Sequence, residues 1–128
     1  MPDGGRRILV VEDNADSAET MQLILKISGY DARAAYDGVS ALEMAREFRP
    51  EVIFLDIGLP GKDGFQVARE LRGLPQTQSA LLVALTGHGY DEDRKRAAEA
   101  GFDQFHVKPV APDALQILLT EHFSKRPL

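Results

Sequence analysis

Cysteine and tryptophan are absent from the 128 residues of this chain, and no apolar run is long enough to span a bilayer. Without cysteine the chain forms neither disulfides nor thiolate metal sites. Positive charge is also scarce, since 15 Lys and Arg stand against 20 Asp and Glu, for a net charge of −5. This surplus of acid argues against direct contact with a nucleic-acid backbone. We therefore expect a cytoplasmic protein without a membrane segment or a direct nucleic-acid partner.

The chain has enough apolar residues, 44%, for one compact core. We expect one domain over residues 6–124, preceded by a flexible leader at 1–5 and followed by a tail at 125–128. No apolar run as long as that of a targeting signal follows the leader or the basic pair at 6–7.

Strands and helices are expected to alternate along the chain. Continuous apolar runs predict three strands that are buried on both faces: 8–11, 52–56 and 81–85. More polar segments predict two edge strands: 30–35 and 102–107. Helical spacing of apolar residues predicts five helices: 15–28, 39–48, 64–72, 91–100 and 113–122. This alternation predicts a doubly wound α/β fold with a five-stranded parallel sheet in the order 2-1-3-4-5.

The helix expected at 91–100 has an unusual composition. Its apolar face consists only of alanines: Ala97, Ala98 and Ala100. Methyl groups bury less apolar area than leucine side chains, so this helix should be the least firmly packed of the five. Charged residues four positions apart predict two stabilising ion pairs on it: Asp91 with Lys95 and Glu92 with Arg96.

Polar side chains follow four of the five expected strands: Glu12 and Asp13, Asp56, Thr86, and Lys108. Because the carboxyl ends of parallel strands meet at one edge of the sheet, these side chains should lie together. Each has an ordinary explanation when taken alone. Asp56 could simply begin a loop, and Glu12 and Asp13 could be the acidic residues common at a helix N-terminus. Thr86 could be an ordinary loop residue, and Lys108 an ordinary solvated charge. Their joint occurrence at successive strand ends favours a functional site.

The residue types at this edge indicate a particular chemistry. Three carboxylates without His or Cys suit Mg²⁺, which prefers oxygen ligands and commonly shares them with a phosphate. The hydroxyl of Thr86 and the ammonium of Lys108 are donors suited to phosphoryl oxygens. The set fits a carboxylate nucleophile with a cation and two donors for the transferred group.

Together these features make the chain resemble the receiver domain of bacterial two-component response regulators, over residues 6–123. The resemblance implies a flavodoxin-like receiver fold and acceptance of a phosphoryl group in a two-component system or phosphorelay, without turnover of a substrate as an enzyme. It is carried by four motifs: ILVVEDN at 8–14, VIFLDIGLPGKDG at 52–64, LTG at 85–87 and GFDQFHVKP at 101–109.

The resemblance also implies residue roles around the metal. Asp56 would be the phosphoacceptor, phosphorylated by a histidine kinase or a histidine phosphotransfer domain. Mg²⁺ or Mn²⁺ would be held by Glu12, Asp13, Asp56 and the backbone carbonyl of Gly58, with Asp13 a direct ligand and Glu12 acting through water.

Further roles concern the switch. Thr86 and Lys108 would bind the phosphoryl oxygens, and Phe105 would be the aromatic residue that turns inward as Thr86 moves. Lys108-Pro109 matches a cis peptide bond of the family. Gly58 and His88 lie two residues after Asp56 and Thr86, beside the path of an attacking water, so we expect them to set the lifetime of the aspartyl phosphate.

Other readings are weaker. A haloacid dehalogenase-like phosphatase would use the same groups but needs a second acid at the position of Gly58. A flavodoxin-like cofactor binder would not place Glu12 and Asp13 beside phosphate, and an unphosphorylated scaffold would lack one of the essential residues. The sequence leaves open whether the receiver stands alone or belongs to a hybrid histidine kinase, and whether phosphorylation produces homodimers.

Overall fold

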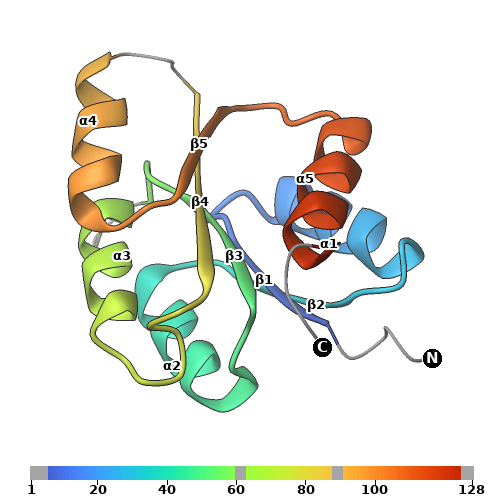
Figure 1. Cartoon of the computed structure of the whole chain (residues 1–128), viewed down its shortest axis with the longest axis horizontal. Helices are drawn as coiled ribbons and strands as arrows, with labels where there is room; N and C mark the ends of the chain where they lie inside the picture. Colours follow the sequence, from blue (N-terminus) through green and yellow to red (C-terminus); the bar gives the residue numbers. More distant parts are fainter. Residues whose placement is uncertain (1–5, 60–62, 88–90, 125–128) are drawn as a thin grey trace.

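A computed structural model describes residues 6–59, 63–87 and 91–124 of the chain. The strands are β1 (Arg7–Val11), β2 (Asp31–Ala35), β3 (Val52–Asp56), β4 (Leu81–Thr86) and β5 (Gln104–Val107). The helices are α1 (Ala15–Ile27), α2 (Gly38–Phe48), α3 (Gly64–Arg72), α4 (Asp91–Ala100) and α5 (Pro112–Ser124). All strand pairs are parallel, in the order β2-β1-β3-β4-β5, which confirms the predicted fold (Figure 1).

The helices cover both faces of the sheet. Helices α1 and α5 lie on one side, and α2, α3 and α4 lie on the other (Figure 1). Each face has its own apolar cluster, built around Leu25 and Leu119 on the first side and around Ala45 and Leu71 on the second. The three apolar strands β1, β3 and β4 are central, as expected of strands buried on both faces.

Short polar side chains start the first three helices. Asn14, Asp37 and Asp63 each accept a hydrogen bond from the backbone N–H three residues later, the N-cap arrangement. The caps at Asn14 and Asp37 begin their helices within three residues of the ends of β1 and β2, whereas Asp63 begins α3 after a longer loop that follows β3. Helix α2 ends where Arg49 adopts a left-handed conformation (φ 53°), one residue before Pro50.

Some local expectations were wrong. Strand β5 begins at Gln104, because Phe102 is buried in the turn before it and serves as core rather than as a strand residue. Ala98 of α4 is exposed, and only Ala97 and Ala100 are buried. Among the described residues no ion pair joins the charges of α4 at i,i+4; the Arg96 guanidinium instead lies 4.2 Å from the centroid of the Phe65 ring.

Arg72 joins three segments at the end of the sheet away from the predicted site. Its guanidinium donates to the carbonyls of Gly101, Gln78 and Ala80, and to Oδ2 of Asp103 at 2.8 Å. The C-terminal end of α4 is thereby tied to α3 and to the start of β4. None of the helices in the described ranges is long and apolar enough to cross a membrane.

Candidate functional site

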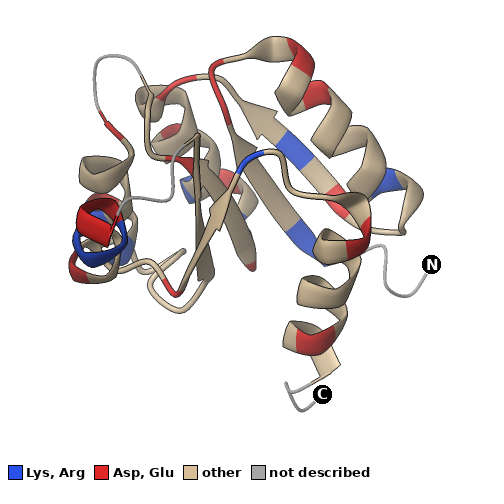
Figure 2. Ribbon diagram, turned by 90° about the horizontal axis from the view of Figure 1, so that it is seen from above, with Lys and Arg blue, Asp and Glu red and all other residues tan. Residues whose placement is uncertain are grey.

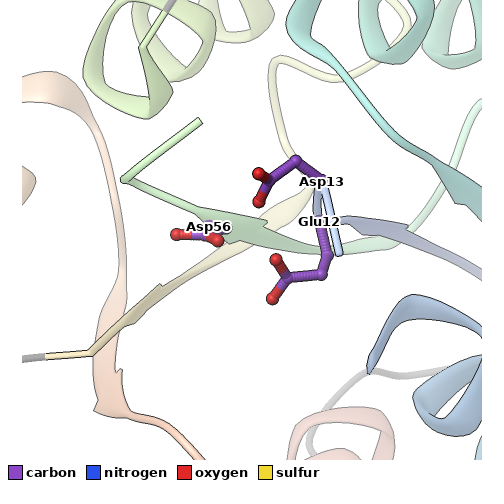
Figure 3. Close-up of side chains that lie close together, drawn as sticks. All are labelled: Glu12, Asp13 and Asp56. Atoms are coloured by element: carbon purple, nitrogen blue, oxygen red, sulfur yellow. The ribbon is translucent and has the colours of Figure 1, made fainter. Parts of the chain in front are cut away.

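The predicted carboxylates meet at the carboxyl end of the sheet. Val11 and Leu55 are register partners in the neighbouring strands β1 and β3, so Glu12 and Asp56 leave the sheet side by side. Figure 3 shows the side chains of Glu12, Asp13 and Asp56 gathered at this edge. Each offers an oxygen within 4.8 Å of the oxygens of the other two. Glu12 and Asp56 are buried, whereas Asp13 is exposed.

The two oxygens of Asp56 have different donors. Oδ1 accepts the backbone N–H of Gly58 at 2.8 Å, and Oδ2 accepts from Nζ of Lys108 at 3.0 Å. The side chain is only 7% exposed. The carboxylate is therefore held in one orientation by donors from its own loop and from the segment after β5.

Lys108 bridges the two buried acids. Its Nζ also donates to Oε1 of Glu12, at 2.8 Å. Burial by itself would lower the pKa of Lys108, but its hydrogen bonds to Glu12 and Asp56 and their charges outweigh this and leave the pKa above its ordinary value. The lysine is therefore the resident positive charge of this site.

Glu12 is the acid most affected by its surroundings. Burial raises the pKa of its carboxyl, and the nearby Asp56 raises it further. Contacts with Lys108 and with the backbone N–H of Asn14 (3.3 Å) act in the opposite direction, but the pKa remains above its usual value. A divalent cation beside this carboxyl group would stabilise its ionised form.

The remaining predicted residues surround this centre. Thr86 is buried at the end of β4, and its carbonyl accepts the backbone N–H of Lys108 at 2.7 Å, which keeps the two strand exits together. The Lys108–Pro109 peptide bond is cis. Phe105 is half-buried on β5, and the guanidinium of Arg94 lies 4.6 Å from its ring centroid. His88 lies outside the described residues.

A cavity of about 400 Å³ opens beside Asp56. Thr86, Lys108 and Gly58 contribute to its lining, as predicted, and so do Ile57, Gly87 and two residues that the sequence analysis missed: Phe65 of α3 and Asp93 of α4. In the sequence, Asp93 is only one of three acids in the first turn of α4. Its spacing of four from Ala97 and seven from Ala100 would have placed it on the buried face of α4.

This arrangement supports a limited set of reactions. A fixed, buried carboxylate at the wall of a cavity is suited to attack an electrophile. Ammonium and hydroxyl donors beside it suit anionic oxygens, and the acid cluster suits a hard divalent cation. Among the described residues that line this cavity there is no His or Cys, and of the two carboxylates there, that of Asp56 is buried and oriented by two donors.

Comparisons with known proteins show the family and the fold of the chain. A family model of the response regulator receiver domain matches residues 8–120. A CheY-like response regulator receiver domain protein from Methanospirillum hungatei JF-1 has the same fold, with a TM-score of 0.87 at 24% identity over 94% of each chain.

Two similar structures are closer in sequence. The receiver domain of a sensor histidine kinase from Pseudomonas aeruginosa PAO1 is 31% identical, with a TM-score of 0.83 over 91% of this chain and 96% of that one; it has a magnesium ion coordinated in its active site cleft. The BeF3-activated N-terminal receiver domain of RstA from Klebsiella pneumoniae is 30% identical, with a TM-score of 0.82 over 91% and 97% of the chains. With the family match spanning nearly the whole described chain, the protein belongs to the response regulator receiver domains of two-component signalling.

Proposed function

We propose that this receiver domain, residues 6–124, accepts a phosphoryl group on Asp56 from a phosphohistidine of a histidine kinase or histidine phosphotransfer domain. The observation that carries the proposal is the setting of the Asp56 carboxylate. It is buried at the wall of the cavity, with one oxygen held by Gly58 and the other by Lys108. A carboxylate oriented in this way loses little freedom when it reacts.

In the transfer, an oxygen of Asp56 attacks the phosphorus atom, the phosphorus–nitrogen bond of the donor breaks, and its electron pair stays on the histidine nitrogen. Lys108 already donates to Oδ2 of Asp56, so its ammonium lies beside the oxygens that arrive. Thr86 lines the same cavity and supplies a hydroxyl donor. The contact between Lys108 and Glu12 keeps the ammonium in the site when Asp56 changes its charge.

The residues present fit a divalent cation, Mg²⁺ or Mn²⁺. We assign as its ligands the carboxylates of Glu12, Asp13 and Asp56, whose oxygens lie within 4.8 Å of one another, and the backbone carbonyl of Gly58. The exposure of Asp13 leaves room for the waters that Mg²⁺ usually retains. When bound, the metal offsets the negative charge of the carboxylates and of the phosphoryl oxygens.

Thr86 and Phe105 would carry the signal away from Asp56. Thr86 moves its hydroxyl towards the phosphoryl group, and Phe105, half-buried beside it in the sheet, turns into the space that this movement opens. The register supports such coupling, because Thr86 pairs with Val107, two residues from Phe105.

Gly58 and His88 would set the lifetime of the phosphorylated form. A side chain added at Gly58 would have room, since its Cβ would lie 3.4 Å from Oδ1 of Asp56, an ordinary contact. The expected outcome of Gly58→Asn, and of a separate substitution of His88, is a changed rate of dephosphorylation. Unchanged decay in both variants would refute this role.

The proposal is tested by intact mass after incubation with acetyl phosphate and Mg²⁺. The wild type should gain the mass of one phosphoryl group, and Asp56→Asn should gain none. Asp37→Asn is the matched control, since it alters an acid that caps α2 away from the cavity. EDTA should abolish the adduct. An adduct that survives Asp56→Asn would contradict the proposed phosphoacceptor.

A further inference from the structure

Helix α4 presents a second carboxylate, besides that of Asp56, to the cavity at the proposed phosphorylation site. Asp93 lines the same space as Asp56, Thr86 and Lys108, and it is partly buried although it belongs to the first turn of a highly charged helix. Figure 2 shows the acidic start of this helix followed at once by basic residues. Its two acidic neighbours in that turn, Asp91 and Glu92, are exposed.

The packing of α4 determines this orientation. Asp93 shares a helix face with Ala97 and Ala100, which are 1% and 2% exposed and lie three or four residues apart. That face is turned towards the sheet, so the residue one turn before Ala97 points to the cavity at the sheet's carboxyl end.

Two arginines flank that face and stabilise it. The guanidinium of Arg94 lies 4.6 Å from the ring centroid of Phe105 on β5, and that of Arg96 lies 4.2 Å from the ring centroid of Phe65 on α3. Such contacts contribute to packing where the alanines of α4 bury little area. Both guanidinium groups therefore lie over aromatic rings on either side of Asp93.

The charges in the cavity are therefore unbalanced. Lys108 is the one cationic side chain among the described residues that line it, and it is already bonded to Glu12 and Asp56. Asp93 adds another negative charge beside the place where an anionic phosphodonor must approach. Like charges in a partly dry cavity repel one another more strongly than in bulk water.

We infer that Asp93 is a specificity-determining residue of the cavity, whose carboxylate disfavours small anionic phosphodonors and favours the divalent cation. This inference rests on the proposed role of Asp56. A small donor has few other contacts to offset the repulsion. A protein donor docks through a larger surface and can offset it with binding energy from elsewhere. Asp93 thus favours phosphorylation by a protein partner over phosphorylation by small metabolites.

The negative charge of Asp93 should repel an anionic phosphodonor and attract Mg²⁺, so its removal should change the two interactions in opposite directions. Asp93→Asn should speed phosphorylation by acetyl phosphate at saturating Mg²⁺ by roughly threefold to tenfold, and should weaken Mg²⁺ binding, followed by calorimetric titration, by a similar factor. Both changes should shrink as sodium chloride is raised, because salt screens the interaction. Asp93→Glu, which keeps the charge, should remain close to the wild type in both measurements.

The matched control is Asp91→Asn, which removes the same charge from the same helix turn at an exposed position. If Asp93→Asn behaves like Asp91→Asn in both measurements while the wild type is phosphorylated on Asp56, the inference is overturned and the proposed function stands. If neither the wild type nor Asp93→Asn takes a phosphoryl group from acetyl phosphate, the proposed function fails, and the Mg²⁺ titration still decides whether Asp93 acts on the cavity. Circular dichroism of each variant checks that it is folded.

Discussion

Replacing Lys108 by methionine tests how the site is held together. The ammonium of Lys108 makes two charge-assisted hydrogen bonds, at 2.8 Å to Glu12 and 3.0 Å to Asp56. Methionine keeps an unbranched apolar side chain of similar reach and removes the charge. The variant leaves two buried carboxylates next to each other without their positive partner.

The size of the effect follows from burial. Removing one partner of a fully buried ion pair costs about 3–5 kcal/mol. Here the acids are nearly inaccessible, with side chains 5% and 7% exposed, but Lys108 is 32% exposed and partly screened by water. We therefore expect the free energy of unfolding at pH 7 to fall by about 2 kcal/mol, near the middle between an exposed and a fully buried pair.

The loss should depend on pH in a defined direction. The pKa of Glu12 is already raised by burial, and the variant removes the Lys108 hydrogen bond that lowers it. A folded-state pKa above the unfolded value means that the folded protein takes up the proton first as pH falls. Stability is then regained as pH falls from that raised pKa towards the ordinary value of 4.5, so the deficit of the variant should shrink over this interval.

Urea unfolding followed by circular dichroism measures this effect, because the chain has no tryptophan to report by fluorescence. The control is Lys95→Met on the exposed side of α4, which should change the unfolding free energy by less than about 0.5 kcal/mol. The reasoning would be refuted by a Lys108→Met deficit no larger than that of Lys95→Met, or by a deficit that grows as pH falls.

Three further outcomes are expected. Gly64→Ala should lower the unfolding free energy by about 2–3 kcal/mol, because the new Cβ would lie 2.4 Å from the Cα of Ile57; Gly58→Ala, which has room, is its control in the same urea series. Asp13→Asn should weaken Mg²⁺ binding by roughly tenfold or more in calorimetric titration, and unaltered affinity would remove Asp13 from the ligands. The hydrogen bond from the Ser40 N–H lowers the pKa of Asp37, so the stability that the ionised Asp37 contributes should be lost as pH falls through that lowered pKa. Asp37→Asn keeps the cap without a titrating group and should flatten this part of the profile of urea midpoint against pH. A profile as steep as that of the wild type would contradict this prediction.

The sequence was sufficient for the fold because its signals are local and agree with one another. The apolar runs at 8–11, 52–56 and 81–85 are strongly patterned, and each becomes a central strand. The caps at Asn14 and Asp63 are likewise local, because each depends on the side chain's own neighbouring backbone. The sequence-based prediction was wrong where packing between distant segments sets the bounds of an element, as at Phe102, whose side chain is buried in the core just before β5 begins.

The convergence of Glu12, Asp13, Asp56, Thr86 and Lys108 also followed from the sequence, because in a parallel sheet every strand ends at the same edge. The tertiary structure decided which of these groups touch. That Lys108 bridges Glu12 and Asp56 depends on a contact spanning 96 residues of chain, which no local pattern encodes.

The environment of α4 likewise depended on tertiary structure. The sequence marks Asp93, Arg94 and Arg96 only as charges on a helix, and the local i,i+4 rule assigned Arg96 to Glu92. In the folded chain Arg96 lies over Phe65 and Arg94 over Phe105, and Asp93 faces the cavity. Local spacing determined the helix, whereas tertiary packing determined what its charges contact, because the aromatic rings beside them belong to α3 and β5.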